Sequence, residues 1–352
     1  LGNPIFTASG CAGMGRELSA FVKLSSLGGF VTPSLTLKPR PGLAAPRSHH
    51  APSGILHANG LPGLGVEQFI DQELPWLVQR GVRVIASIAG QTPEECMRVA
   101  SKLRGAGGFE ALEVNASNRD LGDADWSDAN SADWSAQAVS AVRRASDPRM
   151  PIFAKLSADF TDVVEVAGAV INSGAAGLTL VNSVQGMAVD LNTMRPALAG
   201  SVGGLSGPAI RPIAVASVWR VRSAFPEIPI IGSGGIRSGR DALEFVLAGA
   251  QAVSLGSAII ADPSAPTRIS SELATQLHER GFQRFADAVG YAHRDPDVPL
   301  PEPVSPSDVP PSVFKEPEVS EARSSGVKGE PAGYSDDAGG LADWDFITEN
   351  PR

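Results

Sequence analysis

Short apolar runs rich in β-forming residues recur along the chain, and most are followed by a stretch whose apolar positions have helical spacing. Because a helix between two strands lets them pair in parallel, this alternation predicts a parallel sheet. The expected strands are 4–9, 29–34, 82–89, 111–116, 152–156, 177–182, 228–232 and 252–255, and the clearest helices between them are 92–104, 135–145, 163–173, 210–223 and 240–248.

Eight such strands favour a (β/α)8 barrel, the TIM barrel, over an open doubly wound sheet. The first helix lacks a Gly-x-Gly-x-x-Gly turn, which weakens the doubly wound alternative. In a barrel of this kind, chemistry takes place at the carboxyl ends of the strands. Small and polar residues dominate those ends here, as a flat ligand lying against backbone requires.

The last part of the chain differs from the rest in composition. Residues 295–352 carry thirteen acidic and four basic residues and ten prolines, whereas 1–294 hold equal numbers of acids and bases. Such a segment buries too little apolar area to offset its ordering entropy. We expect a barrel over 1–294 and a disordered, acidic, proline-rich tail over 295–352. Its end, 341–347, is interpreted as solvated tail, with a short docking motif as the alternative.

Composition excludes several classes of protein. The net charge of -9 argues against a nucleic-acid groove, and two cysteines make neither a disulfide scaffold nor an iron–sulfur set. No window is apolar enough to span a membrane, and no signal peptide is visible. Because residue 1 is Leu, we expect the natural start to be missing. No metal site is supported, and we expect a cytoplasmic protein.

Glycine-rich strand ends predict a phosphate site. Gly234 and Gly235 follow the seventh expected strand, and Gly256 and Ser257 follow the eighth. Loops at these positions form the usual phosphate site of a barrel, since glycine lets backbone N–H groups approach an anion closely. A third cluster, ending at Gly207, is expected to wrap the same phosphate.

Lys155 ends an apolar strand, so its charge must reach the barrel mouth or pair with an acid. A structural ion pair is one reading. The other is a cation beside a cofactor ring, where it stabilises a reduced, anionic flavin.

An ordered series of motifs resembles the class 1 dihydroorotate dehydrogenases. The match runs from about residue 1 to 290 and leaves out the tail. Its segments are 1–10, 35–40, 45–47, 52–54, 60–61, 112–115, 155–157, 180–182, 203–208, 231–236, 241–245 and 247–250.

The resemblance implies a TIM barrel with bound FMN that oxidises dihydroorotate to orotate in pyrimidine biosynthesis. In that reaction a base takes a proton from C5 while C6 gives a hydride to flavin N5. It also implies a homodimer, and an NAD-linked route would need an electron-transfer partner subunit. Carried over, the flavin site comprises Ala8, Ser9, Gly10, Asn115, Lys155, Gly207, Gly234, Gly235, Gly256 and Ser257, and the pyrimidine site comprises His57, Asn115, Asn182 and Ser183.

The substrate end departs from the family pattern. Asn118 stands where the family has its catalytic Cys, and an amide cannot take a proton near neutral pH. Arg119 and Asp120 replace a Pro and a substrate-binding Asn. Three further departures are Pro33 for a lysine, His57 for an asparagine, and the pair His49-His50 where an acid commonly lies.

Three functions therefore stay open. The chain oxidises dihydroorotate with a replacement base, acts on another small ring as a flavoenzyme, or binds FMN as an inactive scaffold. The candidate replacement bases are Ser117, Asp120 and His57, of which His57 has the most suitable unperturbed pKa. Cys11 and Cys96 are interpreted as packing residues.

Overall fold

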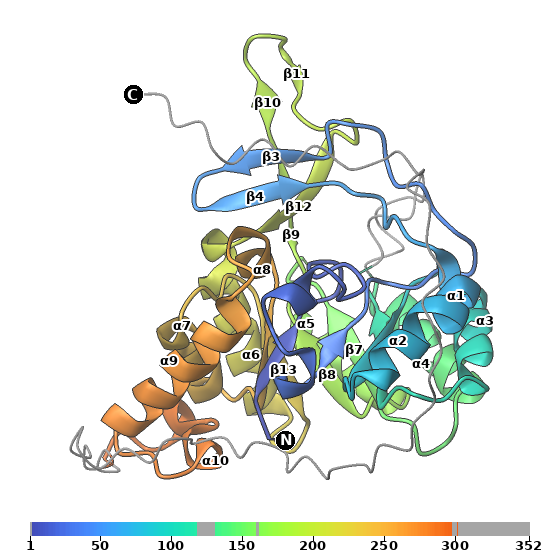
Figure 1. The fold of residues 1–352 in the computed structure, drawn as a ribbon. Helices are drawn as coiled ribbons and strands as arrows, with labels where there is room; N and C mark the ends of the chain where they lie inside the picture. The colour runs from blue at the N-terminus through green and yellow to red at the C-terminus, as the bar shows by residue number, and fades with distance from the viewer. Residues whose placement is uncertain (1, 118–130, 160–161, 298–300, 302–352) are drawn as a thin grey trace, which may run out of the picture. The chain divides into compact units, whose positions relative to one another are not determined.

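The computed structural model describes residues 2–117, 131–159, 162–297 and 301. At its centre, eight parallel strands follow the order β1-β14-β13-β8-β7-β6-β5-β2 (Figure 1). Gly28 N–H donates to the Ile5 carbonyl at 2.8 Å, which brings β2 beside β1 and joins the two ends of the sheet. These strands are β1 (Ile5–Thr7), β2 (Phe30–Val31), β5 (Val84–Ile88), β6 (Ala111–Asn115), β7 (Ile152–Leu156), β8 (Gly177–Leu180), β13 (Ile230–Ser233) and β14 (Ala252–Leu255).

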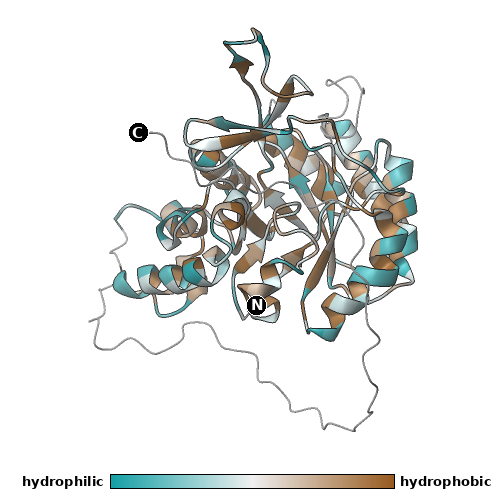
Figure 2. Cartoon of the chain, turned by 45° about the horizontal axis from the view of Figure 1, so that its top comes forward, coloured by the Kyte–Doolittle hydropathy of each residue, from teal (hydrophilic) through white to brown (hydrophobic). Residues whose placement is uncertain are grey.

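Helices surround this barrel, with their apolar faces toward the strands and polar faces outward, as the colouring in Figure 2 shows. Thr92 caps α3, because its hydroxyl oxygen accepts from Glu95 N–H at 3.2 Å. The α-helices are α1 (Gly65–Gln68), α2 (Leu74–Gln79), α3 (Pro93–Arg104), α4 (Ala132–Ala145), α5 (Val163–Asn172), α6 (Arg211–Ala224), α7 (Gly239–Leu247), α8 (Ser257–Ala261), α9 (Ala265–Glu279) and α10 (Phe285–Ala288); η3 (Phe69–Glu73) is π-helical, and η1 (Leu18–Ala20), η2 (Leu24–Ser26), η4 (Pro208–Ile210) and η5 (Tyr291–His293) are short 3-10 turns.

The apolar core has two layers. The larger lies between strands and helices, where fully buried side chains such as Phe30, Phe69 and Phe245 fill the space. A smaller cluster closes the inside of the barrel near the amino ends of its strands and consists of Phe6, Val31, Ile85, Ala111, Ile231 and Ala252. The opposite, carboxyl end of the barrel therefore has room for polar groups.

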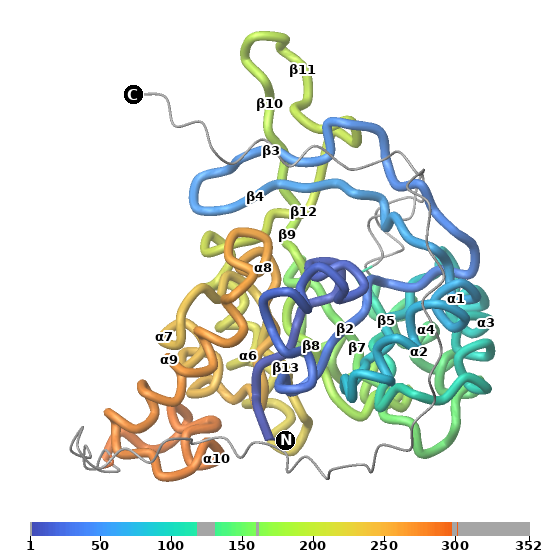
Figure 3. Tube along the Cα trace, in the orientation of Figure 1, coloured from blue at the N-terminus to red at the C-terminus, as the bar shows by residue number. Residues whose placement is uncertain are grey.

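A four-stranded antiparallel sheet lies beyond the carboxyl ends of the barrel strands, and we call it the cover sheet (Figures 1 and 3). Its strand order is β3-β4-β12-β9, and it draws on two distant parts of the chain. Its strands are β3 (Ser48–Ala51), β4 (Gly54–His57), β9 (Val184–Met187) and β12 (Val202–Ser206), and a hairpin of β10 (Val189–Asp190) and β11 (Arg195–Pro196) extends from it.

The barrel and its eight strands confirm the fold predicted from the sequence. The cover sheet was not predicted, and one expectation needs correction. Residues 203–206 of the third glycine cluster form part of β12 rather than a phosphate loop, and only Gly207 lies at the phosphate end. Of the predicted tail, only 295–297 and 301 are described, so it stays a prediction. No helix in the described ranges is long and apolar enough to cross a membrane.

Candidate functional site

Unused backbone donors gather at the carboxyl ends of β13 and β14. These strands are neighbours, with Ser233 opposite Ser254, so the glycines that follow them lie side by side. Within the described part of the chain, the backbone N–H groups of Gly234, Gly235, Gly256 and Ser257 have no recorded acceptor. Such a group of N–H donors is a ready anion site, which matches the predicted phosphate end.

Gly207 joins this phosphate end through close backbone packing. A Cβ on Gly235 would lie 2.6 Å from the Gly207 carbonyl oxygen, and one on Gly207 would lie 2.9 Å from Gly54 Cα. Ala209 N–H donates to the Ser53 carbonyl at 3.0 Å. The tip of the β3–β4 hairpin is therefore attached to the loop that borders the phosphate end.

A hydrogen-bonded network of amides and hydroxyls lies at the ends of β6 and β8. Asn182 Nδ2 donates to Ser117 Oγ at 2.5 Å, and Ser117 Oγ donates to Asn115 Oδ1 at 2.9 Å. Asn115 Nδ2 in turn donates to Ser34 Oγ at 3.3 Å, and Ser34 Oγ lies 3.1 Å from Ser87 Oγ. This network fixes which atoms of the two amides face a ligand.

Ser117 is an unsuitable base in this arrangement. Its hydroxyl is buried, donates to Asn115 and accepts from Asn182, and no titratable side chain among the described residues has a hydrogen bond to it. Its evident role is to orient the two amides.

His57 faces the same site from the cover sheet. Its Nε2 lies 3.0 Å from Ser206 Oγ, a contact between β4 and β12. A Cβ on Gly204 would lie 2.2 Å from Ser183 Oγ and 3.4 Å from His57 Cε1. A side chain at residue 204 would therefore clash with Ser183, whose N–H donates to Asn182 Oδ1 at 3.0 Å. His57 and Ser183 thus both lie against Gly204.

Lys155 is buried at the end of β7, and none of the ion pairs within the described residues includes it. Cys11 is close enough to feel its charge. Burial raises the pKa of the Cys11 thiol, and the Lys155 ammonium opposes this to a smaller extent. The Cys11 sulfur lies 3.9 Å from the Ser9 carbonyl oxygen and packs beside Gly256.

The predicted residues thus converge at one end of the barrel. Ser9 Oγ lies 3.4 Å from Ser34 Oγ, which connects the end of β1 to the amide network. Sequence reasoning assigned no role to Ser34, Ser87 and Ser206, since a serine in a strand or just after one carries no signal of its partners. Asn118 and Asp120 lie outside the described residues, so their predicted roles stay predictions.

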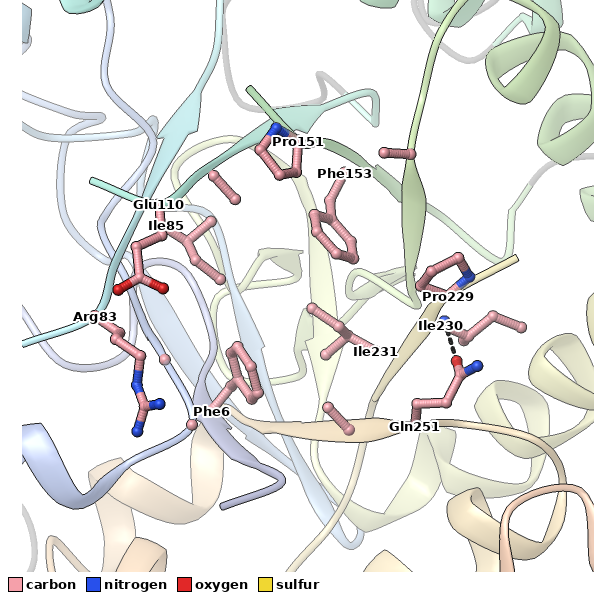
Figure 4. A pocket seen from close by; sticks show the side chains of 15 residues that line it. Phe6, Arg83, Ile85, Glu110, Pro151, Phe153, Pro229, Ile230, Ile231 and Gln251 are labelled. Carbon is pink, nitrogen blue, oxygen red and sulfur yellow. Dashed lines mark hydrogen bonds between the residues drawn. The ribbon is translucent and has the colours of Figure 1, made fainter. Parts of the chain in front are cut away.

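A cavity of about 360 Å³ lies at the other end of the barrel, among the amino ends of the strands (Figure 4). Its wall is mostly apolar, with Phe6, Phe153 and Ile231 facing inward. Gln251 Oε1 accepts from Ile230 N–H, and Arg83 donates to the Leu27 carbonyl, so these two polar side chains already have partners. The cavity is a packing feature remote from the site. Within the described residues, no group of three His, Cys, Asp or Glu side chains is placed to hold a metal ion.

Comparison with known proteins assigns the family. The family model described as dihydroorotate dehydrogenase matches residues 1–277. The chain belongs to the dihydroorotate dehydrogenase family. Among its relatives are proteins named "Dihydroorotate dehydrogenase B (NAD(+)), catalytic subunit". The protein from Desulforudis audaxviator is 42% identical over 84% of this chain and 95% of its own length, and that from Pelobacter propionicus is 43% identical over 82% and 94%.

Membership in the dihydroorotate dehydrogenase family confirms the resemblance read from the sequence. The Anoxybacillus flavithermus relative carries the same name and is 42% identical over 82% of this chain and 92% of its own length. The family match spans the strands that carry both the phosphate end and the amide network.

Proposed function

We propose that this chain is an FMN-dependent oxidoreductase that converts dihydroorotate to orotate in pyrimidine biosynthesis. The observation that carries the proposal is the pairing of unused N–H donors at Gly234, Gly235, Gly256 and Ser257 with the amide network at the same barrel end. The first suits a phosphate, and the second suits the imide edge of a pyrimidine.

The donor set fits FMN, whose phosphate would lie at the glycine-rich ends of β13 and β14. Ala8, Ser9, Gly10, Asn115, Lys155 and Gly207 would surround the remainder of the cofactor. FMN, when bound, would accept the C6 hydride of the substrate at N5.

Asn115, Asn182 and Ser183 hold the pyrimidine ring in this proposal, and His57 receives the C5 proton. His57 suits that task because an imidazole exchanges protons near neutral pH, and Ser206 fixes the orientation of its ring through Nε2. Ser117 acts on the ring only through the two amides it bonds. The cover sheet places His57 over the barrel mouth and excludes water from the ring.

The names of the relatives support a further part of the proposal. They are called catalytic subunits of an NAD(+)-linked enzyme, so we expect a partner subunit that carries electrons from the flavin to NAD+. The chain alone is expected to reduce no NAD+. A homodimer is the expected state of the chain, which light scattering of the purified protein tests.

Anaerobic absorbance of the purified protein, before and after addition of dihydroorotate, tests the activity. We expect a yellow protein whose visible absorbance bleaches on addition of dihydroorotate. FMN that stays oxidised would contradict the proposed substrate and favour another ring substrate or an inactive scaffold. A protein that binds no FMN would contradict the cofactor assignment itself.

A further inference from the structure

A carboxylate lies inside the barrel without a full set of partners. Glu113, on β6, is 2% exposed. Its Oε2 accepts from Thr179 Oγ1 at 2.9 Å, whereas its Oε1 is buried and has no hydrogen-bond partner in the described part of the chain. Buried polar atoms are nearly always bonded, so this one requires an explanation.

The register of the strands places this carboxylate directly beneath Lys155. Glu113 lies on β6 opposite Phe153 of β7, and Thr179 lies on β8 opposite Lys155 of β7. The bond from Thr179 to Glu113 therefore crosses the inner side of β7, between Phe153 and Lys155. Phe153 points into the barrel, as Figure 4 shows, and alternation along the strand directs Lys155 the same way.

Lys155 is likewise buried without an ion-pair partner among the described residues. It is 5% exposed. Its charge also lowers the pKa of the Cys11 thiol, beyond the end of β1, against the larger effect of burial. A cation and a carboxylate that are both buried attract each other more than they would in water, even without direct contact.

We propose that Glu113 is a positioning residue whose carboxylate is the internal counter-charge of Lys155 and restrains the positive field that Lys155 exerts on the flavin. This inference rests on the proposed FMN site. Lys155 favours negative charge on the ring, and Glu113 opposes this from below. The pair together, rather than the lysine alone, sets how readily the ring accepts negative charge.

Sulfite affinity tests this role without turnover. Sulfite uses a lone pair on sulfur to form a bond to N5 of oxidised flavin and leaves a negative charge on the ring, so its affinity reports the local field. We expect Glu113→Gln to tighten sulfite binding about tenfold, the order of effect that loss of one charge near the ring implies. The two-electron midpoint potential should rise by about 30 mV, the equivalent of a tenfold change.

Thr179→Val is a second variant, and we expect it to change sulfite affinity in the opposite direction. Without the Thr179 hydroxyl, the carboxylate loses the one hydrogen bond that the described residues give it and becomes free to move toward Lys155, so sulfite should bind more weakly than in the natural protein. Glu110→Gln is the matched control, because it makes the same change at the amino end of the barrel, and it should leave sulfite affinity unchanged. If the role of Glu113 were purely structural, Glu113→Gln and Thr179→Val would both lower the melting temperature. They would not shift sulfite affinity in opposite directions.

The outcomes separate the two proposals. If the natural protein and the variants hold FMN in full and Glu113→Gln leaves sulfite affinity unchanged, the counter-charge role is wrong while the proposed function stands. If Glu113→Gln does not fold, a Thr179→Val protein with unchanged or tighter sulfite binding overturns the role. If the natural protein holds no FMN, the proposed function fails and this inference fails with it.

Discussion

In the proposed reaction, His57 is the residue that takes the C5 proton. It replaces the asparagine that the family resemblance leads one to expect, it contacts Ser206, and it lies near Ser183 through Gly204. Ser117, the other described candidate for the base, is already committed to orienting Asn115 and Asn182. For this reason we propose His57, among the described candidates, as the base.

Replacing His57 with Gln should slow flavin reduction by dihydroorotate by about 100-fold or more, the usual contribution of a positioned base. Stopped-flow absorbance under anaerobic conditions measures this rate. His49→Gln is the matched control, because His49 is an exposed histidine of the same sheet, and it should leave the rate unchanged. An undiminished rate in the His57 variant would move the base to a residue outside the described ranges, with Asp120 next to be replaced.

Residue patterns identified much of the site but not its connections. Gly234, Gly256 and Lys155 were found because they follow apolar runs whose ends a barrel brings together. The bonds from Ser34 to Ser87 and from His57 to Ser206 join residues 53 and 149 positions apart. Nothing in the local sequence encodes such pairings, so only the folded chain shows them.

At the scale of elements, the cover sheet is the part that sequence patterns could not predict. β3 consists of exposed and half-buried residues and shows no alternation, and β12 reads as a turn because of its two glycines. β3 pairs with β4 in a local hairpin, whereas β12 becomes a strand through pairing at long range with β4 and through pairing with β9. The barrel strands were predictable because burial on both faces makes them continuous apolar runs.

Gly204 of β12 lies so close to Ser183 that a side chain at this position would clash. Gly204→Ala would force its new methyl group against Ser183 Oγ, which lies 2.2 Å from the ideal Cβ position. Overpacking of this kind costs about 1–3 kcal/mol. We expect at least tenfold weaker orotate binding with FMN retained, as measured by titration of the flavin spectrum.

Gly105→Ala is the control for Gly204→Ala, since a Cβ at Gly105 would meet nothing within 4 Å. It should bind orotate as the natural protein does. Equal orotate affinities in the two variants would mean that Ser183 does not contact the ring.

The start of α7 is attached to the phosphate end by an ion pair. Asp241 completes a capping box with Ser238 and also pairs with Arg211, the first residue of α6 after the Gly207 turn. Asp241→Asn should lower the free energy of unfolding by about 1–2 kcal/mol, through the weakened cap and the half-buried pair. Urea denaturation measures this loss. Asp147→Asn, which alters an exposed pair with Arg149, should cost much less than Asp241→Asn, and equal losses would contradict the argument.

At the scale of the whole molecule, the buried thiol of Cys96 links stability to pH. Cys96 is fully buried in α3, and burial raises the pKa of its thiol from 9.0 to about 12. The thiol ionises more readily in the unfolded chain than in the folded one. The unfolded state is therefore favoured once the pH exceeds the pKa of this thiol in the unfolded chain. The resulting stability is present below about pH 9 and is lost as pH rises toward 12, by up to about 1.4 kcal/mol per pH unit.

Cys96→Ala should therefore lose less stability between pH 8 and pH 10 than the natural protein, with urea denaturation at both values as the measurement. The comparison within each protein removes the cost of the smaller side chain itself. A fall of the same size in both proteins would show that other groups carry the alkaline loss. Folded protein at pH 8 should also resist alkylation at Cys96 and Cys11, whereas urea-unfolded protein should react at both.

The attachment of the β3–β4 hairpin to Ala209 has a consequence for how the molecule can be observed. The amide of Ala209 is protected by the Ser53 carbonyl, on the tip of the sheet that covers the barrel mouth. If the tip separates from this loop, that amide can exchange with deuterium in the solvent. The deuterium content of a peptide that spans residue 209 would therefore report how readily the contact between the two segments opens.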